Sequence, residues 1–427
     1  MDLHLQSNAS INDEDKKTSS PEKSSANDKQ TEQSYLGFMS NMISSSMTTS
    51  FAISSAVVGT VYSGVEQAAS ALQPDPIICL RPSWNTQFGL AIKTLRITAH
   101  TVQHDTSTIR LLTDHGIPSF ILPGGVSYHK SRVPRGEWTY LTSTNFKTTK
   151  DLNLPVPIIL YFHGGAFCCC GSKTHRGLLF RLVRATGAIV FAVDYRRPPE
   201  HPFPTPIMDC IEAYQYLLSN FVDPARIVFA GDSAGGSLVA SVSMKVHEMG
   251  LPRPAGGLML SPWVDLSDAG ITDSWYRNES YDYLPQALAK YFASQYMGSL
   301  TNDALASPLY SQHLCALPRL HVEVGECEVL HDQILSFCEK VKASGVEVDI
   351  RVRADMVHVF CLFSFTGLKQ CKDAFVSMGE FVRSCTAGAL LESNSIVLSN
   401  EDIDLDGDID ENAADVNPDE SVLLENS

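Results

Sequence analysis

The chain has 427 residues and a formal net charge of −16, and 44% of its residues are hydrophobic and 19% are charged. These values are ordinary for a globular protein of one or two domains with a sizeable core. The negative charge is concentrated at the ends, because residues 386–427 carry −12 and residues 1–34 carry −3. The remaining residues carry only −1, which argues against a nucleic-acid partner, since such a partner needs a basic patch.

Both ends are polar, and their composition cannot support packing. We therefore expect disorder in residues 1–34 and in the acidic residues 386–427. Residues 35–119 are predicted to form a helical arm that contributes to a cap. Because Ser and Thr interrupt the apolar stretch at 51–65, we expect residues 35–72 to pack on the body or to lie at a membrane surface rather than to span the membrane.

The chain contains eleven cysteines, an odd number, including the run Cys168–Cys170. Its first residues show no charged segment followed by an apolar one, so we predict no secretory signal. The simplest interpretation is that the thiols are reduced and that the protein is cytoplasmic, either unattached or peripheral to a membrane. The cysteines lack the spacing of a zinc site and the H-E-x-x-H pattern is absent, so we expect neither a metal nor a cofactor.

Between residues 120 and 385, apolar runs of strand length alternate with helix-like segments such as 178–185 and 208–218. Runs of this kind are typical of a parallel sheet that is covered by helices on both faces. They occur at 157–162, 187–193, 226–230, 257–260 and 320–324, and a more alternating run at 346–352 is typical of an edge strand. We predict an α/β domain with a mostly parallel, doubly wound sheet over 120–385, interrupted at about 267–300 by an aromatic-rich insertion that forms a cap.

The strongest chemical motif follows the run at 226–230. The sequence continues Gly231-Asp232-Ser233-Ala234-Gly235, and a helix-like segment comes next. G-x-S-x-G between a strand and a helix is the nucleophile elbow, a turn so tight that it needs small residues at both ends. The pattern predicts that Ser233 is the nucleophile of a serine hydrolase.

A nucleophilic serine needs a histidine base and a carboxylate that orients the base. In this fold class the order along the chain is Ser, then Asp or Glu, then His. The loop after 320–324 carries Glu326, Glu328 and Asp332, and His358 follows the run at 346–352. Both loops are expected at the edge of the sheet where α/β enzymes bind their substrates.

The donors of an oxyanion hole are expected after an earlier strand. The run at 157–162 continues His163-Gly164-Gly165-Ala166, and the glycines allow the backbone to approach a substrate oxygen. The N–H group of Ala234, directly after the nucleophile, is the second expected donor. The predicted oxyanion hole therefore consists of the backbone N–H groups of Gly164, Gly165, Ala166 and Ala234.

These segments together resemble the hormone-sensitive-lipase-like esterases of the α/β-hydrolase superfamily. The matching segments are HGGAF (163–167), THRGL (174–178), VDYRRPPEHPFP (193–204), GDSAGG (231–236), LSPWVDLS (260–267), ASPLYS (306–311), GECEVLHDQ (325–333) and DMVHVF (355–360). The resemblance implies the α/β-hydrolase fold with a helical cap and a Ser233–Glu328–His358 triad that works without metal or cofactor. Glu328 stands where the family usually has Asp, which leaves Asp332 as the alternative acid, and Ala166 stands where the family usually has a third glycine.

The sequence therefore predicts a carboxylesterase or lipase that hydrolyses small or lipophilic esters through an acyl-enzyme. A deacetylase of acetylated sterols or similar lipids is the alternative within the same chemistry. An alternative of another class is a non-catalytic receptor for small ligands, since this fold also binds ligands when the triad is broken. The intact His358 argues against the receptor.

Overall fold

An eight-stranded sheet forms the centre of the computed structural model, which describes residues 81–391 apart from 103, 117–123, 148, 221 and 299–302. The strand order is β1-β2-β4-β3-β5-β6-β7-β8. β2 pairs antiparallel with β1 and β4, and all other neighbours are parallel. The strands are β1 (Val126–Arg132), β2 (Arg135–Leu141), β3 (Ile158–Phe162), β4 (Ile189–Val193), β5 (Ile227–Asp232), β6 (Gly256–Leu260), β7 (Leu320–Gly325) and β8 (Val348–Arg353).

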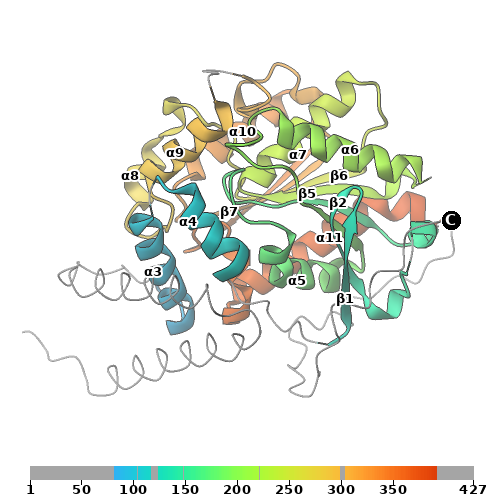
Figure 1. The fold of residues 1–427 in the computed structure, drawn as a ribbon, viewed down its shortest axis with the longest axis horizontal. Helices are drawn as coiled ribbons and strands as arrows, with labels where there is room; N and C mark the ends of the chain where they lie inside the picture. Colours follow the sequence, from blue (N-terminus) through green and yellow to red (C-terminus); the bar gives the residue numbers. More distant parts are fainter. Residues whose placement is uncertain are drawn as a thin grey trace, which may run out of the picture. The chain divides into compact units, whose positions relative to one another are not determined.

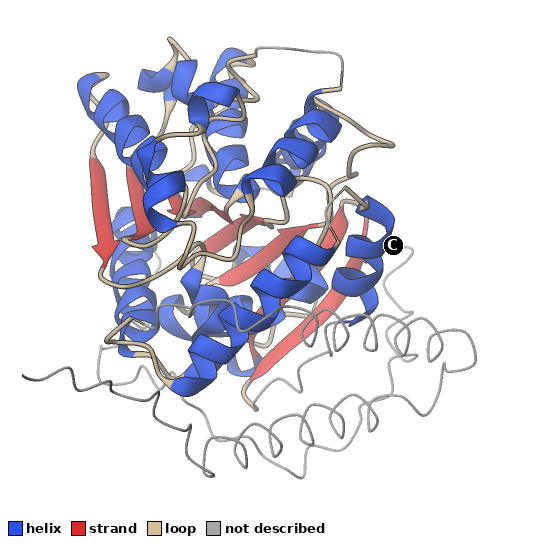
Figure 2. Cartoon of the chain, turned by 90° about the vertical axis from the view of Figure 1, so that its left-hand side faces the viewer, coloured by secondary structure: helices blue, strands red, loops and turns tan. Residues whose placement is uncertain are grey.

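Helices cover both faces of the sheet (Figures 1 and 2). Because strand side chains alternate between the faces, Ile159 and Val190 pack with α5 and α11, whereas Leu160 and Phe229 pack with α6, α7 and α10. Both faces of the central strands are therefore apolar, and β3 to β6 are buried along their whole lengths. The five helices are α5 (Arg176–Thr186), α6 (Thr205–Ser219), α7 (Ala234–Glu248), α10 (His331–Ala343) and α11 (Lys369–Leu391).

The predicted α/β fold is confirmed, and the five apolar runs correspond to β3 through β7. The alternating run at 346–352 is the edge strand β8, as predicted. The sequence did not reveal β1 and β2, which form an antiparallel pair at the other edge. β1 is half-exposed and polar (VSYHKSR), so it lacks the apolar signal of a buried strand.

Four further helices lie together beside the sheet (Figure 1). They are α3 (Thr86–Thr101), α4 (Thr106–Leu111), α8 (Asp273–Asn278) and α9 (Gln286–Met297). α8 and α9 lie within the insertion at 267–300, while α3 and α4 lie within the arm at 35–119. Ala99 of α3 and Ile109 of α4 pack with Phe292 of α9 and with Cys168 after β3.

The predictions for the two ends fall mostly outside the described residues, including disorder in 1–34 and membrane contact by 35–72. At the other end, α11 continues to Leu391, so the disorder predicted for 386–427 is wrong for 386–391, and the rest of that segment lies outside the described residues. Among the described residues, no helix combines the length and the apolar character needed to cross a membrane.

Candidate active site

Ser233 sits in a sharp turn between β5 and α7. Its backbone has φ 51° and ψ −119°, a strained conformation for a residue with a side chain. Gly231 and Gly235 permit this turn, since a Cβ atom on Gly235 would overlap the carbonyl oxygen of Phe162 on the neighbouring strand. The N–H of Ser233 donates to the carbonyl of Leu260 at 2.8 Å, which fixes the turn against β6. The serine therefore stands at the positive N-terminal end of α7, as the motif predicted.

The structure brings His358 to this serine. Ser233 Oγ lies 2.9 Å from His358 Nε2, although the two residues are 125 positions apart. Glu328 is the carboxylate beside the other ring nitrogen, with 3.8 Å between its Oε2 and His358 Nδ1. That distance is longer than a hydrogen bond, and among the described residues neither Nδ1 nor Glu328 Oε1 has another partner. All three side chains are buried.

Asp332, the alternative acid, faces a different part of the molecule. One of its oxygens pairs with Arg277 Nη2 at 2.7 Å, and the other accepts the N–H of Ser274 at 2.8 Å. Both partners belong to α8. Glu328, in contrast, accepts a hydrogen bond from the hydroxyl of buried Ser261, and the hydroxyl oxygen of Ser261 accepts the N–H of Val359.

The pKa of His358 is raised above its ordinary value. Burial alone would lower it, but the carboxylate of Glu328 favours the charged ring and outweighs burial. Asp282 and Asp232 add to the effect from further away. A positive charge that develops on His358 during a reaction is therefore stabilised by this site.

The loop after β3 requires one correction to the predicted oxyanion hole. The N–H of Gly164 donates to Asp232 Oδ1 at 2.9 Å, so it cannot face a substrate oxygen. Among the described residues, no partner is found for the N–H groups of Gly165 and Ala166. Ala234 is the first residue of α7, where a helix leaves the N–H free. Three of the four predicted donors remain available.

Each carbonyl of this loop is fixed, and a trans peptide then turns the next N–H to the opposite side. The His163 carbonyl accepts the hydroxyl of Tyr195 at 2.8 Å, and the Gly164 carbonyl lies 2.7 Å from His163 Nδ1. The Gly165 carbonyl accepts the N–H groups of Cys168 and Cys169, both at 3.0 Å. These contacts orient the N–H groups of Gly164, Gly165 and Ala166 before any substrate arrives.

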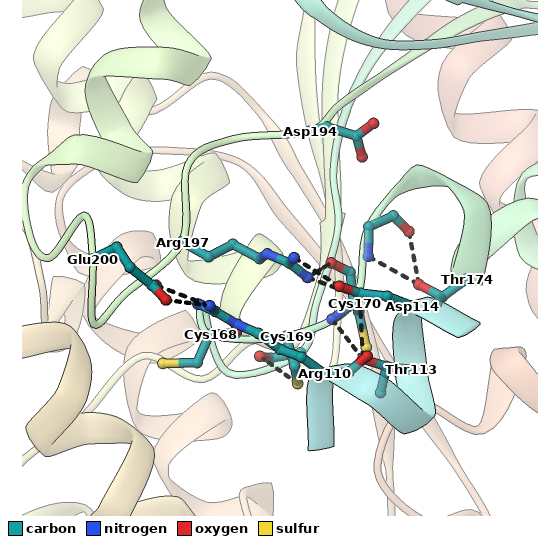
Figure 3. A network of polar contacts seen from close by, with 12 residues as sticks. Arg110, Thr113, Asp114, Cys168, Cys169, Cys170, Thr174, Asp194, Arg197 and Glu200 are labelled. Atoms are coloured by element: carbon teal, nitrogen blue, oxygen red, sulfur yellow. Dashed lines mark hydrogen bonds and ion pairs between the residues drawn. The ribbon is translucent and has the colours of Figure 1, made fainter. Parts of the chain in front are cut away.

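Two arginines hold the cysteine run that follows the loop, as Figure 3 shows. Arg110 of α4 donates to the carbonyl of Cys168 at 2.7 Å and pairs with Glu200 at 2.8 Å. Arg197 donates to the carbonyl of Cys170 at 2.6 Å and pairs with Asp114 at 2.8 Å. The N-terminal arm therefore supports the loop that carries the candidate oxyanion donors.

A buried charge cluster lies beneath the elbow. Asp232 accepts from Tyr161 at 2.7 Å and lies 3.2 Å from His175 Nε2, while His175 Nδ1 lies 3.1 Å from the carbonyl of Gly171. Burial disfavours a charge on both side chains, but their attraction raises the pKa of His175 to about 9 and lowers the pKa of Asp232. The pair is therefore charged at neutral pH and keeps Asp232 in place to bind Gly164.

Sequence reasoning missed several residues that shape the site, namely Asp232 as the partner of Gly164, Ser261, His175 and Asp282. The motifs GDSAGG, THRGL and LSPWVDLS contained three of them, but nothing in a motif shows which way a side chain points. Asp282 lies in the insertion and follows no pattern. The fold and this arrangement define an α/β hydrolase with a serine on its elbow.

Comparisons with known proteins agree with that class. A sequence model of the alpha/beta hydrolase fold matches residues 159–362. The chain is 34% identical over 233 residues to an acetyl-hydrolase of Streptomyces hygroscopicus, a match covering 54% of this chain and 77% of that protein. It is 32% identical over 233 residues to an esterase of Acinetobacter venetianus, covering 53% and 75%, respectively. A solved esterase of the bacterial hormone-sensitive lipase family aligns with a TM-score of 0.64 at 33% identity, covering 71% of this chain and 99% of that one.

The chain belongs to the hormone-sensitive-lipase-like family of α/β hydrolases. It is an enzyme of the serine ester hydrolase class. The fold, the elbow serine and the relatives agree on this point, which the sequence motifs predicted.

The backbone of Ala166 provides a first prediction. Its φ is 50°, a left-handed conformation that disfavours a side chain. Replacing it with glycine should raise the free energy of unfolding by up to about 1 kcal/mol, because the strain is relieved. Ester hydrolysis should be retained, since the N–H group is unchanged. Denaturant unfolding together with p-nitrophenyl ester hydrolysis measures both, and a loss of activity of an order of magnitude would contradict a purely backbone role.

The charged His175–Asp232 pair provides a second prediction. The pKa of His175 rises from 6.5 when unfolded to about 9 when folded, so its contribution to stability is complete below pH 6.5 and is lost as pH rises through 9. The denaturant concentration at the unfolding midpoint of the wild type should therefore decrease as the pH is raised from 6.5 to 9. His175→Gln should show a lower midpoint at pH 6.5 and a flatter decline. An equally steep decline in the variant would show that another group is responsible.

Proposed function

We propose that the enzyme hydrolyses carboxylic esters through an acyl-enzyme formed on Ser233, with His358 as the base and Glu328 as the orienting acid. The observation that carries the proposal is the 2.9 Å contact between Ser233 Oγ and His358 Nε2. A nucleophile within hydrogen-bond reach of a base, with a carboxylate behind the base, is the arrangement needed to activate a serine.

In the first half of the reaction, Ser233 Oγ attacks the ester carbonyl carbon and passes its proton to His358 Nε2. The tetrahedral oxyanion accepts hydrogen bonds from the N–H groups of Gly165, Ala166 and Ala234. When the intermediate collapses, the bond to the alcohol breaks and the alcohol takes the proton from His358. Water then attacks the acyl-serine with the same assistance, which releases the acid and restores Ser233.

Glu328 acts on the other side of the imidazole ring. Its carboxylate faces Nδ1, which favours the tautomer with a proton on Nδ1 and leaves Nε2 free to accept. Hydrogen bonds of this kind are often long in a free enzyme and shorten when substrate binds. We propose that the 3.8 Å separation shortens as positive charge develops on His358. Asp332, bound to α8, is left as a structural residue.

The proposed substrate is an ester, and two substrate ranges are considered, that of a general esterase and that of a deacetylase. A general esterase would accept acyl chains of graded length. A deacetylase of acetylated sterols or lipids is favoured by the similarity to the Streptomyces hygroscopicus acetyl-hydrolase. Rates of hydrolysis of p-nitrophenyl acetate, butyrate, octanoate and palmitate distinguish them. The rate of a deacetylase should decrease steeply from acetate to butyrate, whereas the rate of a general esterase should not.

Removal of the nucleophile is the primary test of the proposed function. Ser233→Ala should reduce kcat for p-nitrophenyl butyrate by about four or more orders of magnitude, leaving only what the oxyanion hole supplies. Ser243→Ala is the matched control, since Ser243 is a buried serine of α7 whose hydroxyl donates to the carbonyl of Val239 within the same helix. It should keep wild-type kcat. Normal hydrolysis by Ser233→Ala would end the proposal.

The identity of the acid is tested by paired isosteric variants. Glu328→Gln should lower kcat by about two to four orders of magnitude, and Asp332→Asn by about one order or less. Because Glu328 raises the pKa of His358, Glu328→Gln should also move the acid limb of kcat/KM to lower pH. Circular dichroism confirms that both variants are folded. If Asp332→Asn is the more impaired variant, Glu328 is not the triad acid.

A further inference from the structure

A second buried carboxylate faces the histidine loop from the insertion. Asp282 lies between α8 and α9 and is only 3% exposed. Its Oδ1 accepts the N–H of His358 at 3.3 Å and the N–H of Tyr283 at 2.8 Å, and its Oδ2 accepts the N–H of Val329 at 2.8 Å. One side chain therefore joins the insertion, the loop of the acid and the loop of the base.

The same region of the insertion holds the other side of the peptide bond between Glu328 and Val329. Asn278, at the end of α8, donates to the Glu328 carbonyl at 2.8 Å, while Asp282 accepts the N–H of Val329. Both polar groups of this peptide are thus bound by residues only four positions apart. The backbone of the proposed acid cannot rotate without breaking contacts with the insertion.

The carboxylate also contributes charge at the base. The titratable groups that act on Asp282 are His358, Glu328 and Tyr283, whose own pKa is raised well above its ordinary value by burial and by Asp282. Arg96 of α3 donates to the backbone carbonyl of Asp282 at 2.9 Å. Burial raises the pKa of Asp282 to about 6, and the nearby His358 opposes that rise. Asp282 is therefore anionic above about pH 6, where its charge helps to raise the pKa of His358.

We propose that Asp282 is a positioning residue for the reaction, which fixes the loops of Glu328 and His358 to the insertion and stabilises the protonated form of His358 as a second anion. The inference rests on the proposed function. In this proposal the insertion helps to hold the triad residues in place.

A purely structural role and a positioning role differ in their effect on the pH profile. A structural aspartate lowers stability or kcat when replaced, but it leaves the ionisation of the base unchanged. Removing a negative charge beside His358 should instead lower the pH at which the base loses its proton. The acid limb of kcat/KM reports that ionisation in the free enzyme.

The experiment compares Asp282→Asn with two controls in the full-length enzyme, using p-nitrophenyl butyrate between pH 4.5 and 9. Asp265→Asn removes another buried carboxylate, one that binds Ser267 and Tyr310 instead of the triad loops. Asn278→Ala loosens the Glu328 peptide while keeping the charge of Asp282. Titration of the active serine with diethyl p-nitrophenyl phosphate gives kcat per competent molecule, so partial unfolding does not affect the result.

Asp282→Asn should lower kcat/KM by about one to two orders of magnitude and move its acid limb to lower pH by about one pH unit. Asn278→Ala should lower kcat without moving the limb, and Asp265→Asn should leave the limb in place. If Asp282→Asn does not fold, Asp282→Ser is put through the same comparison. The inference would be overturned if the acid limb of Asp282→Asn, or of Asp282→Ser in its place, lay at the same pH as in the wild type. It would also be overturned if Asp265→Asn moved the limb by the same amount.

The outcome is separable from that of the proposed function. Should Ser233→Ala remain active, the triad itself is wrong. Should Ser233→Ala be inactive while Asp282→Asn matches the wild type in rate and pH profile, the triad stands and only the role of Asp282 fails.

Discussion

The contact between Ser233 Oγ and His358 Nε2 depends on two loops that are far apart in sequence reaching the same point within a few tenths of an ångström. Parallel strands bring this about, because β5 and β8 both end at the same edge of the sheet. The tight turn at Gly231–Gly235 then raises the serine clear of that edge. A third loop follows β3, which is parallel to β5, and it is held by Asp232 and by the arginines that bind the cysteine run.

Buried carboxylates help to hold these loops in place. Asp232 binds the backbone of the loop after β3, and in our proposal Glu328 and Asp282 act on the imidazole ring and backbone of His358. A buried carboxylate is costly unless hydrogen bonds or an opposite charge compensate for burial, and these side chains have both kinds of partner. Polar groups in this interior therefore specify geometry where apolar packing could not.

Much of the fold could be predicted because its signals are local. β3 to β7 are apolar runs, and β8 alternates as an edge strand should. β1 could not be predicted, since its pattern is half-exposed and polar. β2 is mostly buried, but its sequence RGEWTYL begins with Arg-Gly-Glu and so shows no apolar run. The candidate site could be predicted only in part for the same reason. A motif shows which residues lie near the end of a strand, but it does not show which way their side chains or peptide groups point.

Gly164 and Asp282 illustrate that limit. The glycines after β3 correctly marked a loop at the active edge, yet peptide orientation decided that Gly164 faces Asp232 while Gly165 and Ala166 do not. Asp282 is a single acid in an aromatic insertion, and only the packing of the insertion brings it to His358. Contacts that depend on how distant segments pack cannot be recognised from a short stretch of sequence.

The most direct test of the central claim is to locate the covalent adduct that a p-nitrophenyl phosphonate forms with the full-length enzyme. Intact-mass spectrometry followed by peptide mapping identifies the modified residue. One adduct per chain on Ser233, formed more slowly as pH falls and His358 becomes protonated, is the predicted result. An adduct on any other residue, or none under conditions where the enzyme hydrolyses p-nitrophenyl butyrate, would contradict it.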